Sequence, residues 1–181
     1  MKQLVICITA LLLLNASSCD QSNNNCLPVT TDNSANVNEF LGLWYEHGSI
    51  NQFFSVGCDC TTAEYTTSTT AGQVTVTNTC DRFGFNSDIV GFAYAPDAND
   101  FGKLKVNFPS FPGGDADYWI LFFDGPGGLM LVGNPDKDNL YILSKNNTIS
   151  QSDYDGLLAI AEDMCFDISK VKVTDQTNCG S

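Results

Sequence analysis

The feature that most constrains the fold is a series of short strand-like segments separated by turn residues. Between residues 41 and 143, segments of four to six residues are apolar throughout or alternate apolar with polar residues, and each ends near Gly, Pro, Asn or Asp. A period of two over so few residues is typical of strands rather than helices. Together with a strand around Trp44, we count eight such segments: 63–67, 74–77, 89–94, 104–108, 118–123, 129–133 and 140–143.

Only one stretch has the period of a helix, and it lies late in the chain. Its apolar positions are Tyr154, Leu157, Leu158, Ala161 and Met164. Ser150, followed three residues later by Asp153, resembles a capping box and predicts where this helix begins. A last strand is expected at 171–174. Eight consecutive strands joined by short turns predict an all-β fold, an antiparallel up-and-down barrel, because closure removes the exposed edges of such short strands.

The N-terminal residues are typical of a secretory signal peptide. Lys2 precedes an apolar run at 4–14, and small residues follow at 16–18. The run is well short of the roughly 20 residues that a membrane span needs. We therefore predict a signal peptide at 1–18, a flexible Asn-, Ser- and Thr-rich leader at 19–38, and a folded domain at 39–179.

Composition narrows the classes of partner and site. The chain has 8 basic and 21 acidic residues, a formal charge of −13. That balance argues against a nucleic-acid partner and against charge-driven binding to anionic lipid. His47 is the single histidine, and Cys58-Asp59-Cys60 lacks the C-x-x-C spacing of a zinc knuckle. We expect no metal and no cofactor.

Cysteine usage fits an oxidising compartment. Of 8 cysteines, Cys7 lies in the predicted signal peptide, so an odd number remains. Cys19 follows small residues, as in the lipobox of bacterial lipoproteins, although Ala16 stands where that motif has Leu. Lipidation or removal of Cys19 would leave an even number for disulfides. The protein is thus expected to be secreted or extracytoplasmic, either soluble or lipid-anchored.

The segment at the first strand, Gly42-Leu43-Trp44-Tyr45-Glu46, resembles the G-x-W-Y-E opening of the lipocalin family. The resemblance is to the apolipoprotein D and bacterial outer-membrane lipocalin (Blc-like) branch, and it runs in order over residues 39–179. It continues through Val74-Thr75-Val76-Thr77-Asn78, Tyr118-Trp119-Ile120-Leu121, Leu140-Tyr141-Ile142-Leu143-Ser144-Lys145 and Val173-Thr174-Asp175-Gln176-Thr177-Asn178-Cys179. It implies a C-terminal helix packed outside the barrel, and a cup that carries a fatty acid, lysolipid, sterol, retinoid or bilin.

Two positions depart from the family pattern. Relatives usually have Arg where Lys145 stands, over the tryptophan of the closed end. Lys145 keeps the cation–π contact with Trp44 but lacks the planar fork of a guanidinium. Tyr141 stands where relatives have Trp and adds a hydroxyl to the expected pocket. Gly42, Trp44 and Lys145 are expected to be structural residues of the closed end.

Strand alternation and the resemblance together predict which side chains line the cup. If Phe108 faces inward, so do Val106 and Leu104; if Tyr118 faces inward, so do Ile120 and Phe122, and Phe123 faces outward. The expected ligand-binding residues are Tyr65, Val76, Asn78, Leu104, Val106, Phe108, Tyr118, Ile120, Tyr141 and Leu143. Asn78 and the tyrosine hydroxyls could fix a carboxylate or hydroxyl head. The alternative is that these side chains fill the barrel and leave no cavity.

The resemblance aligns Cys60 with the cysteine that pairs with the C-terminal Cys179. Cys58 and Cys80 are expected on the two arms of one hairpin, which favours a second bridge and leaves Cys26 with Cys165. Six cysteines allow many connectivities, so these last two pairs stay open.

The function predicted is that of a carrier and not an enzyme, acting as a monomer or weak dimer. The inward positions assigned above carry no Asp, Glu, His or Cys, and neighbours such as Glu46 and His47 should face opposite sides of the strand. A lipocalin-fold enzyme and a pigment-binding or oligomerising lipocalin remain alternatives. Phe53 and Phe54, in a loop, could contact a membrane or gate the mouth. Asn146-Asn147-Thr148 is an N-glycosylation sequon.

Overall fold

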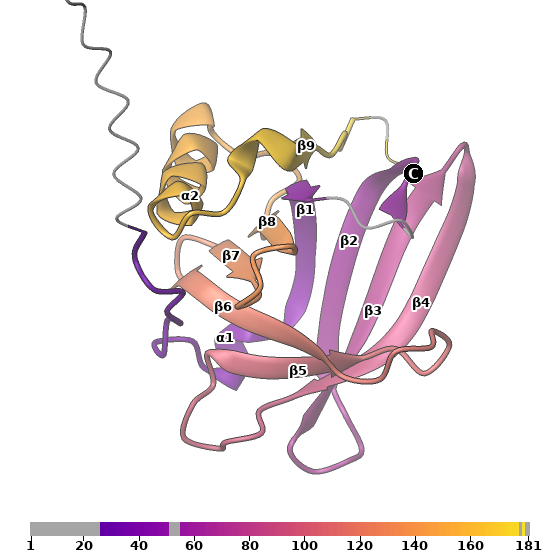
Figure 1. Cartoon of the computed structure of the whole chain (residues 1–181). Coiled ribbons are helices and arrows are strands. Elements are labelled where there is room, and N and C mark those ends of the chain that lie inside the picture. The colour runs from indigo at the N-terminus through magenta and orange to yellow at the C-terminus, as the bar shows by residue number, and fades with distance from the viewer. Residues whose placement is uncertain (1–25, 51–54, 178, 180–181) are drawn as a thin grey trace, which may run out of the picture.

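The computed structural model describes residues 26–50, 55–177 and 179 (Figure 1). Its elements are α1 (Val37–Phe40), β1 (Gly42–Ile50), β2 (Cys58–Thr67), β3 (Gln73–Arg82), β4 (Phe85–Tyr94), β5 (Lys103–Asn107), β6 (Ala116–Asp124), β7 (Leu129–Gly133), β8 (Leu140–Ser144), α2 (Gln151–Asp163), η2 (Ile168–Lys170) and β9 (Val171–Val173). Each strand from β2 to β7 pairs antiparallel with the next. The predicted up-and-down barrel with one C-terminal helix is confirmed.

The first strand closes the barrel. Residues 42–45 of β1 pair with β2, while residues 45–49 pair with β8. Residues 48–50 of β1 pair with β9 along the edge that faces β2 at residues 42–45, and β9 lies outside the barrel. Gln176, after β9, donates from Nε2 to the carbonyl oxygens of Glu46 and Thr61 at 2.7 and 2.8 Å. The C-terminal segment therefore joins β1 to β2 where their direct pairing ends.

Buried apolar residues form two clusters, one on each face of the sheet. The inner cluster fills the barrel with residues such as Trp44, Val76 and Met130. The outer cluster packs α2, through Leu157 and Ala161, against the outer sides of β6, β7 and β8. All five positions of the predicted helical pattern contribute to this outer cluster, and the Ser150 hydroxyl caps the helix at Asp153 N (3.1 Å).

The predicted facing of two phenylalanines is wrong. The β6–β7 register shifts between Ile120 and Phe122, so Leu121 is an extra residue in the ladder. The bulge reverses the alternation beyond it. Phe123 joins the inner cluster and Phe122 joins the outer one.

One end of the barrel is closed by α1 and Trp44. Trp44 is fully buried, and its Nε1 donates to the Phe40 carbonyl oxygen at 2.8 Å. Lys145 Nζ lies 4.2 Å from the centre of the Trp44 ring and donates to the Leu41 carbonyl oxygen at 2.6 Å. Gly42 has φ +102°, and a Cβ there would lie 3.2 Å from Lys145 Nζ, so this close approach favours glycine. The expected closed-end residues thus lie together.

Residues 26–36 differ from the flexible leader that their composition predicts. Cys26 is disulfide-bonded to Cys165, and Leu27 N donates to the Asp163 carbonyl oxygen at 2.8 Å. Asp32 accepts from Phe123 N at 3.0 Å. The bridge and these hydrogen bonds hold the segment against the barrel despite its polar composition. The predicted signal peptide, Cys19, Phe53 and Phe54 lie outside the described residues.

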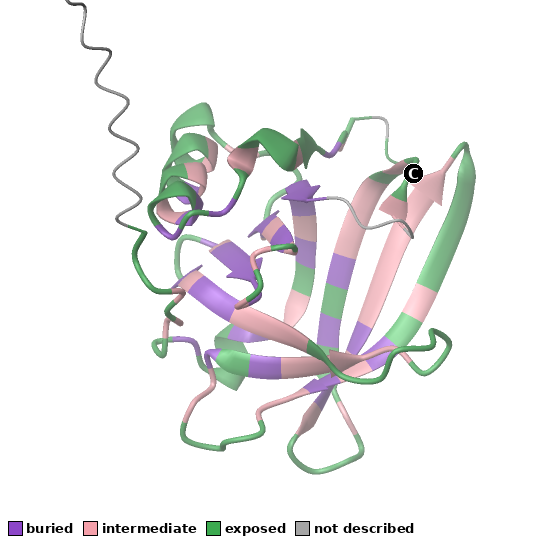
Figure 2. Cartoon of the chain, in the orientation of Figure 1, coloured by how far each residue is buried: buried purple, intermediate pink, exposed green. Residues whose placement is uncertain are grey.

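Two further disulfides, Cys58–Cys80 and Cys60–Cys179, lie near the end opposite α1. At that end β2, β3 and β4 rise together beyond β5, and the upper part of β4 is exposed (Figure 2). The β3–β4 ladder runs from residue 85 to residue 94, whereas β5 pairs with residues 92–94 alone. Between residues 85 and 91, β4 therefore has a ladder partner on one edge only among the described residues.

Candidate ligand-binding site

The sequence-predicted pocket residues occupy two levels of the barrel interior. Toward the closed end, the lower level is sealed and consists of Tyr65, Val76, Leu104, Ile120 and Leu143, each at most 3% exposed. Toward the open end, the upper level is only partly buried and consists of Asn78, Val106, Phe108, Tyr118 and Tyr141. We call this upper level the cup.

On each of four strands, one cup residue stands two positions from a sealed residue, on the side toward the open end. Asn78 follows Val76 by two residues on β3, and Val106 follows Leu104 on β5. On β6 and β8, which run in the opposite direction, Tyr118 and Tyr141 precede Ile120 and Leu143 by two residues. Side chains two apart on a strand share a face, so each pair points into the barrel.

A glycine makes room for the aromatic wall. Phe108 lies against Gly91 of β4, where an added Cβ would come within 2.6 Å of the phenyl ring and still closer to the Asn107 carbonyl oxygen. A larger residue at 91 would displace Phe108 from the cup.

Three tyrosines make the polar part of the cup. The Tyr65 and Tyr118 hydroxyls are hydrogen-bonded at 2.6 Å, and the Tyr118 and Tyr141 rings stack with centroids 6.3 Å apart. Burial raises the pKa of all three phenols, and the neighbouring tyrosines raise that of Tyr118 further. At neutral pH these hydroxyls are therefore protonated and able to donate.

Asn78 presents an unused acceptor. Its Oδ1 is buried and has no hydrogen-bond partner. A buried carbonyl oxygen without a donor is costly, so a ligand that supplies one would be stabilised at this position.

Glu46 is an inward-facing acid that the sequence analysis missed. It lies opposite Leu143 in the β1–β8 register and two residues after Trp44, so it shares their inner face. Its Oε1 accepts from Ser49 Oγ at 2.9 Å and Thr174 Oγ1 at 2.5 Å. Burial raises the pKa of Glu46, and these two hydrogen bonds oppose that rise. Alternation from Trp44 was the signal that could have found it.

His47 has separate partners from Glu46. Its Nε2–H donates to the Asn146 carbonyl oxygen at 3.0 Å, whereas Glu46 bonds Ser49 and Thr174. The two side chains do not form an acid–base dyad. Within residues 26–50, 55–177 and 179, no group of three or more His, Cys, Asp or Glu is placed to hold a metal ion.

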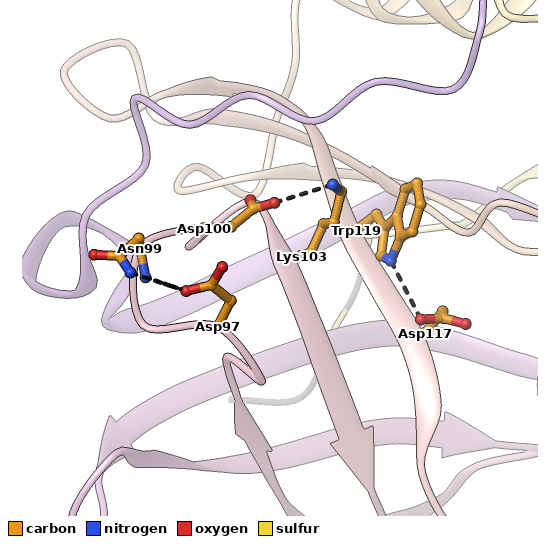
Figure 3. Close-up of polar contacts among 6 residues, drawn as sticks. All are labelled: Asp97, Asn99, Asp100, Lys103, Asp117 and Trp119. Atoms are coloured by element: carbon orange, nitrogen blue, oxygen red, sulfur yellow. Dashed lines mark hydrogen bonds and ion pairs between the residues drawn. The ribbon is translucent and has the colours of Figure 1, made fainter.

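Two hollows lie away from the cup. One, of about 300 Å³, opens beside α1 at the closed end and is lined by Val37, Val74, Ala93, Phe101 and Leu104, among others. The other, of about 180 Å³, lies on the outer face (Figure 3). There Lys103 pairs with Asp100 at 3.0 Å, and Trp119 donates to Asp117 at 3.2 Å. Acidic and basic side chains in nearly equal number line the outer hollow, whereas mainly apolar residues line the hollow at the closed end.

Comparison with known proteins decides the family. The lipocalin-like domain family matches residues 35–176. The chain belongs to the lipocalin family. It is 34% identical to temperature-induced lipocalin-1 of Arabidopsis thaliana over 152 residues, covering 79% of this chain and 80% of the relative. It is 33% identical to the outer membrane lipoprotein Blc of Escherichia coli K12 over 149 residues (78% and 80%).

The branch expected from the sequence is also represented. This lipocalin is 30% identical to apolipoprotein D of Cavia porcellus over 154 residues, covering 79% of this chain and 78% of the relative. Among solved structures, insecticyanin of the tobacco hornworm Manduca sexta superposes with a TM-score of 0.67 at 24% identity, covering 83% and 85% of the two chains. That likeness shows the fold. Among the described residues of this lipocalin, no helix is long and apolar enough to span a membrane.

Proposed function

We propose that this lipocalin is an extracytoplasmic carrier that holds one small hydrophobic ligand, of the class of a fatty acid, lysolipid, sterol or retinoid, in the cup. Membership of the lipocalin family supports the general role of a carrier of small hydrophobic molecules. The ligand-contacting residues proposed are the cup residues Asn78, Val106, Phe108, Tyr118 and Tyr141. The sealed level, Tyr65, Val76, Leu104, Ile120 and Leu143, forms the floor beneath the ligand.

The observation that carries this proposal is the partial burial of the cup. Its side chains are mostly apolar or aromatic and point into the barrel, yet they keep contact with solvent while the residues beneath them do not. Apolar surface that is still in contact with water is stabilised when a lipid covers it, at about 25 cal/mol per Å².

The location proposed follows from the disulfides. The three bridges described above need an oxidising compartment. One relative is named an outer membrane lipoprotein, which supports an extracytoplasmic place and keeps lipidation of Cys19 as a proposal. Asn146 is exposed, so the sequon would be accessible in a eukaryotic secretory pathway.

We further propose that the protein carries and does not catalyse. The six described cysteines are all in disulfides, so none of them supplies a pocket thiol. Glu46 is the acid of the interior and is hydrogen-bonded to two hydroxyls rather than to a base. A bound lipid therefore meets donors and acceptors, without a paired nucleophile and base.

The test is native mass spectrometry of protein purified from its own source, followed by lipid extraction. We expect a complex with one lipid per chain. Two recombinant variants locate the site. Ile89→Trp fills the cup, because Ile89 is opposite Asn78 in the β3–β4 register, and should abolish lipid retention. Val90→Trp, on the next residue and 52% exposed, should retain it. A protein that stays empty with every lipid offered would refute the carrier role.

A further inference from the structure

Building on the proposed carrier function, we propose that the cup selects lipids whose head is an uncharged hydroxyl and rejects those that end in a carboxylate. The inference uses three polar features of the interior: the free acceptor of Asn78, the donor of Tyr118, and the acid Glu46. Each restricts the ligand head in a different way.

Asn78 requires a donor. Its Oδ1 is buried without a partner, and it faces into the barrel one step above Val76. A carboxylate has acceptors only and would leave this oxygen unpaired, or repel it. An alcohol donates one hydrogen and satisfies it.

Tyr118 supplies a donor. Of the two hydrogens carried by the Tyr65 and Tyr118 hydroxyls, the bond between them uses one. Tyr65 is sealed beneath, whereas Tyr118 reaches the cup, so the second hydrogen is best used by Tyr118 toward a ligand oxygen. A ligand hydroxyl can accept from Tyr118 and can also donate to Asn78, whereas a carboxylate can only accept.

Glu46 makes the interior unfavourable for an anion. Its carboxyl lies on the inner face opposite Leu143, and it accepts a hydrogen bond from Ser49, which is opposite Tyr141 in the β1–β8 register. When Glu46 is ionised, a second carboxylate nearby would be repelled in a medium of low dielectric constant.

The cations of the described residues bear on where an anion could be held. Lys172 of β9 is opposite Ser49, in the same row as Tyr141, but it is exposed on the strand outside the barrel. Lys145 lies under Trp44 at the closed end. Arg82 is four residues beyond Asn78 on β3, about 13 Å toward the rim at the usual rise per residue. Its guanidinium contacts Cys58 Sγ at 3.6 Å. A carboxylate held by Arg82 at the rim is the competing arrangement.

The experiment compares two pairs of probes that differ in the head alone: retinol with retinoate, and oleyl alcohol with oleate, at pH 8. Dissociation constants are measured by tryptophan fluorescence and calorimetry on the full mature chain. We expect each alcohol to bind about tenfold more tightly than its acid. Asn78→Leu should remove that preference by weakening the alcohols, while the outward-facing control Thr77→Leu should keep it.

Glu46→Gln gives an independent readout. It retains a carbonyl acceptor for Ser49 and Thr174 but carries no charge, so binding of the two acids should strengthen several-fold while binding of the alcohols stays constant. Equal affinities for acids and alcohols in the parent protein would overturn the selectivity and leave the carrier function standing. Acids that bind more tightly, and lose this in Arg82→Gln, would overturn it in favour of the rim arrangement. If no member of either pair binds, both the inference and the proposed function fail.

Discussion

The two levels of the barrel interior have similar sequence patterns and different environments. Below, Leu104, Ile120 and Leu143 are at most 3% exposed. Two residues further along the same strands, toward the open end, Val106, Tyr118 and Tyr141 are only partly buried. Both levels follow from strand alternation, so alternation alone does not distinguish a floor from a binding surface.

The neighbours make the difference. The lower level is covered by α1, Trp44 and the pairing of β1 with both β2 and β8. At the upper level Asn78 brings a polar group into the wall, opposite Ile89 of β4 and beyond the residues 92–94 that pair with β5. Stability should therefore depend mainly on the lower level, and ligand affinity on the upper level.

The largest effect is expected from a matched pair on β5. Leu104→Ala removes a fully enclosed side chain and should lower the free energy of unfolding by about 2–5 kcal/mol. Val106→Ala, on the same face but partly exposed, should cost no more than about 1.5 kcal/mol and should instead weaken lipid binding. Urea denaturation and a lipid titration of both variants check this. If Leu104→Ala and Val106→Ala lost similar amounts of stability, the distinction between a stabilising lower level and a ligand-binding upper level would be wrong.

A smaller effect is expected at the closed end. Lys145→Met keeps the stem of the side chain but removes the cation over Trp44 and the donor to the Leu41 carbonyl oxygen, and should cost about 1–2 kcal/mol. Lys145→Arg should restore most of it. Thermal unfolding monitored by circular dichroism measures the stability of both variants. An unfolding temperature of Lys145→Met equal to that of the parent protein would show that this contact does not stabilise the closed end.

The smallest effect is a pH dependence at Glu46. Burial raises the pKa of Glu46 in the folded state above its ordinary value of 4.5. The neutral acid is then favoured by folding, so its contribution is complete below pH 4.5 and is lost as the pH rises through the folded-state pKa. Glu46→Gln cannot ionise, so its stability relative to the parent should increase from pH 4 to pH 8. Denaturation curves across that range test the sign, and a decrease would contradict it.

The three disulfide pairs give a prediction about the covalent links that surround both levels of the barrel interior. Mapping of unreduced peptides should recover Cys26–Cys165, Cys58–Cys80 and Cys60–Cys179. Replacing both Cys60 and Cys179 by Ser frees the segment that joins β1 to β2, and unfolding should become easier by about 2–4 kcal/mol, within the range expected for Leu104→Ala. Other pairings, or free thiols among these six, would show that this set of links is incorrect.

The sequence was sufficient for the architecture, because each strand is bounded by turn residues and the helix by its cap. It failed where a local irregularity leaves no compositional trace. Leu121, Phe122 and Phe123 are all apolar, so the bulge that exchanges the facing of the two phenylalanines could not be seen. The four-residue α1 is too short to have a period. Residues 26–36 are polar, and their attachment depends on a distant cysteine and on the backbone of β6.

The sequence predicted which side chains of the candidate site face the barrel interior, but not how deeply each of them is buried. The residues named from alternation face inward, yet half of them belong to the floor. Depth depends on how far each neighbouring strand extends, which the sequence does not show. Glu46 was not predicted as an inward residue, although it follows Trp44 by two, which is the spacing that puts two strand residues on one face.

The central claim, that a lipid occupies the cup above a sealed floor, is tested most directly by methyl NMR during a retinol titration. We predict chemical-shift changes at the Val106 and Ile89 methyl groups, with the Ile120 and Leu104 methyl groups unaffected. Shifts concentrated at Val74, Ala93 and Leu104, around the hollow beside α1, would place the ligand at the closed end and contradict the account.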